Sequence, residues 1–422
     1  MAKEQLPQID QTALDTIIAK HELFRRGRTG GVRAQIAHHD LSRLVFRERD
    51  LSHADFTGSI FFEADLAHAK LDYTQFFACD LRRANFRGAS LVRSDLRGAC
   101  LRGASMTGAD LSDADLREGS FASYDPQKGL AFIHDRSAWA EGSGGVDMRG
   151  ATLASAKLSG TVATNSNFED ANLTKASFIR GDLSGANLSG ANLTGADLSH
   201  CVLKNINLRG AVMVGTVVDF SNLKDVDMTG ALTDQPTGKT FRQSIVPFED
   251  VLSLHQIWLK SKGVEGKKLD ISDFDMRMTP SLSKADLTMI LADRTLWMEQ
   301  NFSGANLQVA QFKGGNLRDC NFVDADLRGS DFTGARLVGS KLTSAHLEPL
   351  WLNESKRFLK TNFTNANLRY TNFVRADLRE VDFTGADLSS SDLTGADITD
   401  AIFEKTILEN TKIDLSKISA PA

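Results

Sequence analysis

The sequence predicts an all-β solenoid, in which short strands coil around a packed interior. A large apolar residue recurs in steps of five from Ile36 to Phe121. A small residue, most often alanine, stands two positions before many of these apolar residues, and a polar residue lies between the two. The prolines fall outside the regular repeats, where a missing amide hydrogen does not interrupt a ladder of stacked strands.

The spacing of five excludes simpler structures. It fits neither the 3.6-residue turn of an α-helix nor the alternation of a flat strand. The apolar residue and the small residue must point to the same side, as on a short strand. The residues that follow must then turn a corner, for which glycine and polar residues are suited. We therefore expect each repeat to form one side of a coil around an apolar core.

The motifs also resemble a known family. Ala109-Asp110-Leu111-Ser112 and Ala186-Asn187-Leu188-Ser189 are closely similar to the repeats of the pentapeptide-repeat family, and similar motifs cover most of the chain. The resemblance implies a right-handed quadrilateral parallel β-helix with four pentapeptides per coil. Residues twenty apart would then stack, so the alternating Phe and Leu residues between Phe302 and Leu337 would form separate ladders.

Interruptions of the repeat predict two β-helical modules. The expected segments are an N-terminal segment (1–35), a first module (36–232) with a loop at 122–145, a connector (233–267), a second module (268–415) with a break at 348–358, and a tail (416–422).

Each module is preceded by an apolar stripe with helical spacing, and we expect each stripe to form a short N-terminal α-helical cap. Such a helix would cover the open edge of the first coil. His21 and His255 would then pack in the apolar stripe and have a structural role. A basic, glycine-containing stretch follows each stripe, at 27–33 and 263–268. The two stripes are Leu14, Ile17, Ile18, His21 and Phe24, and Phe248, Val251, Leu252, His255 and Trp258.

Bulky and sulfur-containing residues follow the same scheme. A tryptophan is expected to be too large for the inward position of a slim coil, so Trp139, Trp258, Trp297 and Trp351 are expected in irregular segments. Cys79, Cys201 and Cys320 occupy inward positions usually held by alanine, whereas Cys100 occupies an outward position. Without a CxxC pair, these residues predict a reduced, cytoplasmic protein.

Composition argues against several functional classes. The formal charge of −5 is too mild to indicate binding to nucleic acid or to a membrane surface. No catalytic or phosphate-binding motif occurs, and most Asp residues simply occupy the outward position of the repeat. We therefore expect a non-enzymatic protein without a cofactor. His38, His39 and Asp40, with His53 and His68, are the one group that suggests a metal, but packing under the cap is the favoured interpretation.

Two features are candidates for partner binding. The loop 122–145 contains aromatic residues, which either project as a binding surface or fold back onto the coils. Arginines twenty apart form two ladders, which either bind an acidic partner or lie on a solvated face with Asp counter-ions. The loop residues are Tyr124, Phe132, His134 and Trp139, and the ladders are Arg82 with Arg102 and Arg97 with Arg117.

These observations favour a rigid scaffold that presents loops and flat faces to a protein partner. The family resemblance implies an alternative, because some pentapeptide-repeat proteins mimic DNA and bind DNA gyrase. Against this, acidity here is weak, although residues 268–422 carry a net charge of −4. No amphipathic helix is evident from Ile407 onward, so homodimerisation through the last coil is also expected.

Overall fold

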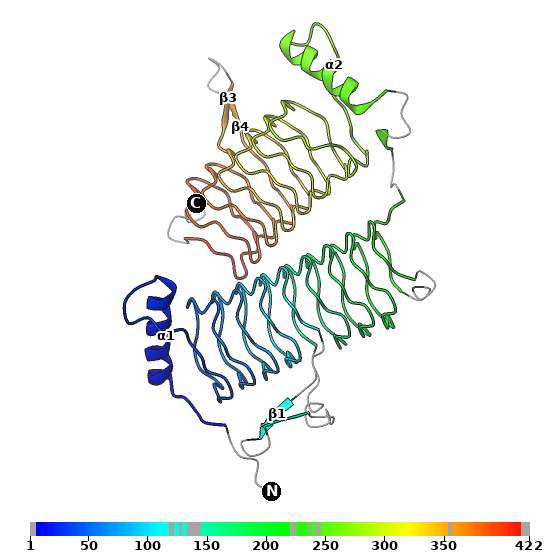
Figure 1. Cartoon of the computed structure of the whole chain (residues 1–422). Coiled ribbons are helices and arrows are strands. Elements are labelled where there is room, and N and C mark those ends of the chain that lie inside the picture. The colour runs from blue at the N-terminus through cyan, green and yellow to red at the C-terminus, as the bar shows by residue number, and fades with distance from the viewer. Residues whose placement is uncertain are drawn as a thin grey trace. The chain divides into compact units, whose positions relative to one another are not determined.

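The five-residue repeats form coils whose backbones pair in parallel with residues twenty positions along the chain. In one column, Asp55 pairs with Gln75 and Gln75 pairs with Asp95. The Phe56 amide donates to the Gln75 carbonyl at 2.9 Å, and the Gln75 amide donates to the Ala54 carbonyl at 3.0 Å. Four repeats therefore complete each coil, and the chain forms the predicted right-handed quadrilateral β-helix (Figure 1).

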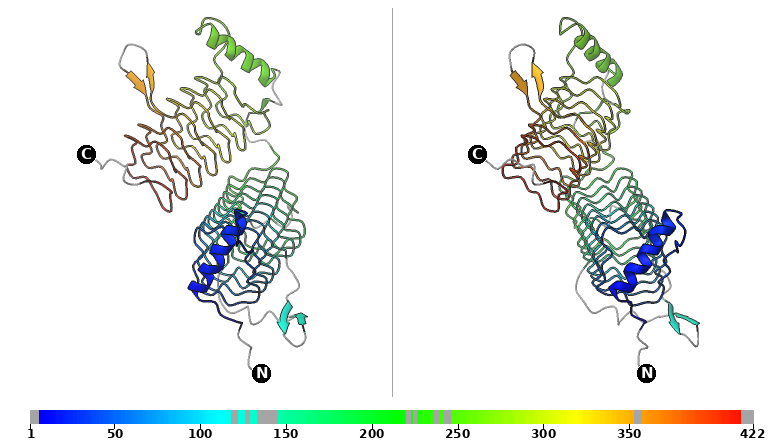
Figure 2. Two further views of the ribbon diagram at one scale, coloured as in Figure 1. Left: turned by 60° about the vertical axis from the view of Figure 1, so that its left-hand side comes forward. Right: turned by 90° about the vertical axis from the view of Figure 1, so that its left-hand side faces the viewer.

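The coils are organised in two compact units, Met1–Asp234 and Gln235–Ala422. Figure 2 shows the stacked coils of each unit from two further directions. The computed structural model describes residues 6–117, 122–125, 129–132, 145–219, 223, 226–235, 239–241, 246–352 and 357–414.

A tight turn forms each corner of the coil. In the repeat that begins at Leu51, the Ala54 amide donates to the Leu51 carbonyl at 3.0 Å. The third residue of this turn, His53, has a φ of 68°, which places it in the left-handed region of a type II turn. Such a φ costs a non-glycine residue about 1–2 kcal/mol, and the pairing of stacked coils offsets this cost.

Phenylalanine ladders fill much of the interior of the second unit. The rings of Phe302 and Phe322 stack with centroids 5.0 Å apart, and those of Phe312 and Phe332 are also 5.0 Å apart. These pairs lie twenty residues apart, as the coil geometry requires, and all four side chains are fully buried. Burial of each ring contributes about 1.5–3 kcal/mol, so the ladders are a major source of stability.

Trp297 contradicts the expectation that tryptophan lies only in irregular segments. It occupies a regular inward position, its amide donates to the Asn316 carbonyl, and its side chain is 0% exposed. The preceding inward position holds Ala292, which is also buried. The indole ring lies 5.1 Å from the ring of Phe302, which occupies the next inward position.

Two helices pack against these cores. Helix α1 (Gln11–Arg25) begins after Asp10, whose carboxylate caps the Ala13 amide, and it buries Leu14 and Ile18 in the core of the first unit. Helix α2 (Phe248–Lys260) contributes Phe248 to the core of the second unit.

A buried histidine on each helix has the structural role expected of it. The Ala34 amide donates to His21 Nδ1 at 3.0 Å, and His21 Nε2 donates to the Ser52 carbonyl at 3.1 Å. The Leu269 amide likewise donates to His255 Nδ1 at 3.2 Å. Burial lowers the pKa of both imidazoles, which keeps the rings neutral.

Two β-hairpins extend from the coils. Strands β1 (Ala122–Asp125) and β2 (Gly129–Phe132) pair in the first unit, and β3 (Leu350–Leu352) and β4 (Arg357–Leu359) pair in the second. The stacking resumes after each excursion, since Ser105 pairs with Asp147 and Asp331 pairs with Asn362.

Replacement of Trp297 by alanine should destabilise the second unit by about 3–5 kcal/mol, because the indole leaves a cavity in a tightly packed interior. The measurement is the denaturant midpoint of the full chain, followed by circular dichroism. Trp351→Ala removes the same side chain from an exposed site and should change the free energy of unfolding by about 0.5 kcal/mol or less. Equal effects of the two substitutions would contradict a packed position for Trp297.

Stability should fall as the pH drops below about 7, because the unfolded histidines, with a pKa near 6.5, bind protons that the buried neutral rings resist. The loss should continue until the pH passes the lowered pKa values of folded His21 and His255. Unfolding midpoints measured across this range should show a shallower pH slope for His21→Gln than for the exposed His200→Gln. Identical slopes would disprove the contribution of His21.

Candidate partner-binding sites

The structure gives only part of the predicted binding loop. Tyr124 lies in strand β1 and Phe132 in strand β2, which pair as an antiparallel hairpin. The structure does not describe the side chains of these two residues, and His134 and Trp139 lie outside the described residues. The loop therefore stays a prediction as a binding element.

The arginine ladders are lined with carboxylates. Three of the four arginines each donate two hydrogen bonds to one carboxylate. Arg82 donates to Asp80 at 2.8 and 2.7 Å, and Arg97 donates to Asp95 at the same distances. Arg117 donates to Asp115 at 2.9 and 2.6 Å. In each case the carboxylate belongs to the residue two positions earlier.

These ion pairs favour the solvated-face interpretation of the ladders. Each guanidinium is already neutralised by a fixed counter-ion, and Arg97 also lies over the Phe77 ring at 5.6 Å. An incoming acidic group would have to compete with the paired aspartates. Arg102 follows Arg82 by twenty residues and is half-buried. The ladders are consequently weaker candidates for binding an acidic partner than an arginine without an ion pair would be.

The hairpin β3–β4 is firmly attached to the second unit. Gly329 has a φ of +69°, and a Cβ atom there would lie 2.9 Å from the Cβ of Leu359 and 3.6 Å from that of Leu350. The absence of this atom lets both hairpin ends pack against the coil. Thr361 Oγ1 donates to the Leu347 carbonyl at 2.8 Å and accepts from the Gly329 amide at 3.2 Å.

The hairpin presents an exposed tryptophan. Trp351 is opposite Phe358 in the strand pairing, their rings lie 5.1 Å apart, and Trp351 remains 64% exposed. A cleft of about 450 Å³ runs beside it. We call this the hairpin cleft, and it is lined by Arg328, Glu348, Pro349, Trp351, Arg379, Glu380, Thr399 and Asp400.

The hairpin cleft is acidic despite its two arginines. Its three carboxylates, Glu348, Glu380 and Asp400, outnumber the arginines. Each arginine also binds an aspartate outside the lining at 2.6 Å, Arg328 to Asp326 and Arg379 to Asp377. Of its carboxylates, Glu380 pairs with Lys360 at 3.1 Å, while Glu348 is 3.9 Å from Arg328. An exposed indole beside such carboxylates suits a partner that carries both apolar and basic groups.

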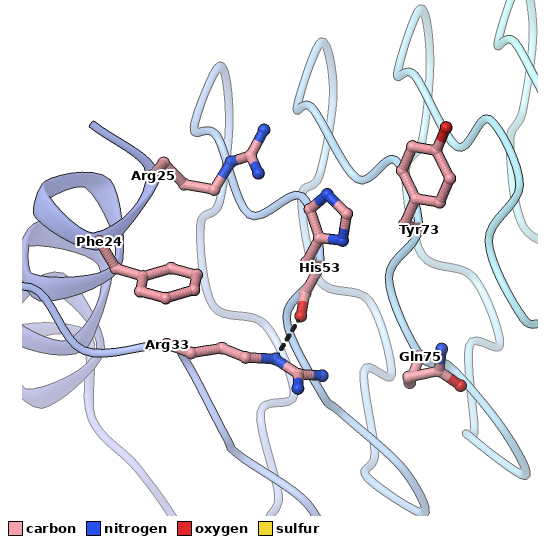
Figure 3. Close-up of a pocket in the computed structure, with 6 residues that line it drawn as sticks. All are labelled: Phe24, Arg25, Arg33, His53, Tyr73 and Gln75. Atoms are coloured by element: carbon pink, nitrogen blue, oxygen red, sulfur yellow. Dashed lines mark hydrogen bonds between the residues drawn. The ribbon is translucent and has the colours of Figure 1, made fainter. Parts of the chain in front are cut away.

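A second cleft, of about 500 Å³, lies in the first unit at the C-terminal end of α1 (Figure 3). We call it the helix cleft. Its lining residues are Phe24, Arg25, Arg33, His53, Tyr73 and Gln75.

The histidines proposed as an alternative metal site have other contacts. His39 Nδ1 lies 2.7 Å from the Ala37 carbonyl, and the His53 ring stacks on Tyr73 at 4.8 Å. Within the described part of the chain, no group of three or more His, Cys, Asp or Glu side chains is arranged to hold a metal ion. None of the helices in that part is long and apolar enough to cross a membrane.

The hairpin cleft was missed by sequence reasoning, although two signals pointed to it. The break at 348–358 contains Trp351 and Pro349, which are unusual among the repeats. Glu380 and Asp400 are twenty residues apart, the separation that places residues in one column. An aromatic residue in a break of the repeat, next to a column of acidic residues twenty apart, is the pattern that indicates this site.

Comparison with known proteins identifies a matching family model. A family model described as Pentapeptide repeats matches residues 40–73, 78–117, 147–190, 191–230, 310–348, 357–385 and 371–410, which is more than half of the chain. No curated protein sequence matches.

The solved structures that match include three pentapeptide-repeat proteins. QnrB1, a plasmid-mediated fluoroquinolone resistance protein, is 19% identical, with 48% of this chain and 86% of that chain covered and a TM-score of 0.26. HetL from Nostoc sp. strain PCC 7120 is 19% identical, with 92% and 94% covered and a TM-score of 0.16. A protein of the Arabidopsis thaliana thylakoid lumen is 28% identical, with 26% and 72% covered and a TM-score of 0.17.

The cysteines should behave as inert packing residues. Burial raises the pKa of Cys79, Cys201 and Cys320, and their thiols donate to main-chain carbonyls. At neutral pH, a chromogenic disulfide reagent should react slowly with the half-buried Cys100 and with the other three only after denaturation. Rapid reaction of any thiol in the folded protein would instead indicate an activated nucleophile.

Proposed function

Because this chain belongs to the pentapeptide-repeat family, we propose that its β-helix is a non-enzymatic scaffold that binds a protein partner. The observation that carries this proposal is the exposure of Trp351 on a hairpin whose base is packed against Gly329. An aromatic side chain held rigidly in solvent loses little conformational entropy on binding and contributes a large contact area. Such residues dominate the binding energy of many protein interfaces.

The chemistry of the hairpin cleft defines the expected partner. Glu348, Glu380 and Asp400 line the cleft together with the apolar Trp351 and Pro349. A lysine or arginine of the partner would meet both the carboxylates and the face of the indole, which attracts cations. The partner segment is therefore expected to be basic and to carry an apolar residue.

Other parts of the chain complete the proposed scaffold. The loop 122–145 is a further proposed contact surface, and the ion-paired arginine ladders are weaker ones. Helices α1 and α2 are proposed as caps over the first coil of modules 36–232 and 268–415. The free cysteines support a reducing, cytoplasmic location. Ile402 and Ile407, exposed in the last coils, support homodimerisation through that end.

Binding to DNA gyrase through DNA mimicry is a second candidate function. One observation favours it: five successive outward positions of the last coils are all aspartate. They are Asp377, Asp382, Asp387, Asp392 and Asp397. Four of them are already near cations. Asp377 lies 2.6 Å and Asp397 3.8 Å from Arg379, Asp392 lies 3.3 Å from Lys412, and Asp387 lies 3.9 Å from Arg369. This local neutralisation makes gyrase binding the weaker of the two proposals.

Affinity capture from a bacterial lysate should recover a specific protein with the wild-type chain and much less of it with Trp351→Ala. A loss of roughly tenfold or more is expected if the indole is a central contact, because such residues contribute at least 2 kcal/mol. A variant in which a Gly-Ser link replaces 122–145 tests the first loop in the same experiment.

The matched control is Leu352→Ala, which alters the neighbouring and less exposed residue of β3. Recovery of gyrase subunits by every variant, together with an effect of the protein on supercoiling, would favour DNA mimicry. Equal capture by wild type, Trp351→Ala and the loop variant would contradict both proposed contact elements.

A further inference from the structure

We propose that the helix cleft binds an acidic peptide segment of a partner protein, with a carboxylate on Arg33 and an aromatic side chain between Phe24 and His53. This site goes beyond the scaffold function proposed above. It lies in the first unit and has the opposite charge preference to the hairpin cleft.

The cleft has aromatic side chains on two sides and cations on the other two. Figure 3 shows the Phe24 ring projecting from α1 toward His53, with Arg25 and Arg33 on either side of the space between them. Gln75 contributes a neutral amide farther along the coils. The volume of about 500 Å³ is within the range of pockets that bind small ligands or peptide side chains.

Arg33 is oriented for anion binding. Its Nε donates to the His53 carbonyl at 2.6 Å, which fixes the plane of the guanidinium. The two terminal nitrogens remain available as a fork that matches a carboxylate. Within the described residues, no carboxylate lies at ion-pair distance from Arg33, in contrast to Arg82, Arg97 and Arg117.

The aromatic walls are held in place by their own contacts. His53 and Tyr73 stack in parallel with ring centroids 4.8 Å apart. Arg93 donates to Tyr73 Oη at 3.1 Å and lies over its ring at 5.9 Å. Phe24 and Tyr73 are each 42% exposed, so the fold leaves apolar ring surface uncovered at this site. A guest ring would bury that surface without rearrangement of the walls.

The local charge is positive. No Asp or Glu lines the cleft, and the nearest charge pairing of a lining residue is between Arg25 and Asp50 at 3.7 Å. Arg26 and Arg28 are exposed on the adjoining turn, with no ion pair among the described residues. The C-terminus of α1 contributes only about half a negative charge, and turn amides already use the Glu22 and Phe24 carbonyls. Cationic side chains therefore determine the sign of the potential.

A short acidic peptide suits this site better than nucleic acid or a membrane. Those partners require a broad basic surface, because their charges extend along a backbone or across a plane. Residues 1–121 contain 17 basic and 17 acidic groups, so this part of the chain carries no net positive charge that would favour such a partner. The ring-lined walls additionally favour a ligand that combines a negative charge with an aromatic group.

The second unit provides an internal comparison. Trp258 holds the position in α2 that Phe24 holds in α1, and a basic stretch follows both helices. There, however, Lys268 lies over the Trp258 ring at 5.9 Å, and Gly263 lies against the same indole. The cation and the aromatic ring of the second unit contact each other, whereas those of the first unit flank an open space. The binding site is accordingly assigned to the first unit alone.

The test is fluorescence anisotropy of a fluorescein-labelled peptide of alternating aspartate and phenylalanine, titrated with the full chain. Saturable binding is expected, and Arg33→Gln should weaken it roughly tenfold or more, because a charge-assisted hydrogen-bonded pair is lost. Arg43→Gln removes one exposed positive charge elsewhere in the same unit and should leave the affinity within about twofold. Arg33→Lys should restore part of the binding, since it keeps the charge without the fork.

Phe24→Ser leaves the hydrogen bond of Arg33 intact and removes the aromatic wall of the cleft, so it should also weaken binding. Weaker binding by a variant that remains folded shows loss of the site and not loss of the fold. Circular dichroism of each variant checks the fold. Trp351→Ala should bind the peptide normally, so failure of the scaffold proposal would not affect this result. Equal affinities of Arg33→Gln and Arg43→Gln would overturn the proposal. So would equal binding of an alternating aspartate–alanine peptide, or Arg33-dependent binding of phosphatidylserine vesicles without binding of the peptide.

Discussion

The pairing of each residue with the residue one coil farther along is the constraint on which this structure depends. The amide of each inward residue donates to the next coil, and the amide before it donates to the previous coil. A central coil thus satisfies its main-chain groups only when both neighbours are in register. This requirement sets the four corners, the left-handed turn residues and the alignment of side chains in columns. Buried phenylalanine ladders and exposed charge ladders are two results of the same periodicity.

Columns also explain how the candidate sites arise. His53 and Tyr73 stack because they are neighbours in one column, and Arg93 reaches Tyr73 from the next coil of that column. Glu380 and Asp400 line the hairpin cleft for the same reason. Elements outside the repeat then close each site: α1 contributes Phe24 and Arg25 to one cleft, and β3 contributes Trp351 to the other. The regular coils therefore align the side chains of each site, and the elements that interrupt the repeats add the residues that make the two sites different.

The sequence predicted the features that depend on periodicity. It identified the coil, the phenylalanine ladders and the two helical segments, because each requires only a repeated spacing of apolar residues. It failed for Trp297, since room for an indole at an inward position depends on how the surrounding side chains pack, which the spacing of the repeats does not specify. The helix cleft was also not predicted, because it depends on side-chain conformations. Arg33 donates to the His53 carbonyl beside the cleft, whereas Lys268 lies over the Trp258 ring. The two basic stretches were visible in the sequence, but the different positions of their cations relative to the neighbouring aromatic rings were not.

The junction of the hairpin with the coil at Gly329 has a consequence for the diversification of this architecture. The pairing of Asp331 with Asn362 and the stacking of Phe332 on Phe363 at 4.9 Å show that the coils align across the inserted segment. The tip is therefore free to change in length and sequence while the junction stays the same. Natural selection or protein engineering can therefore insert different recognition hairpins at this corner without altering the stacked coils on either side.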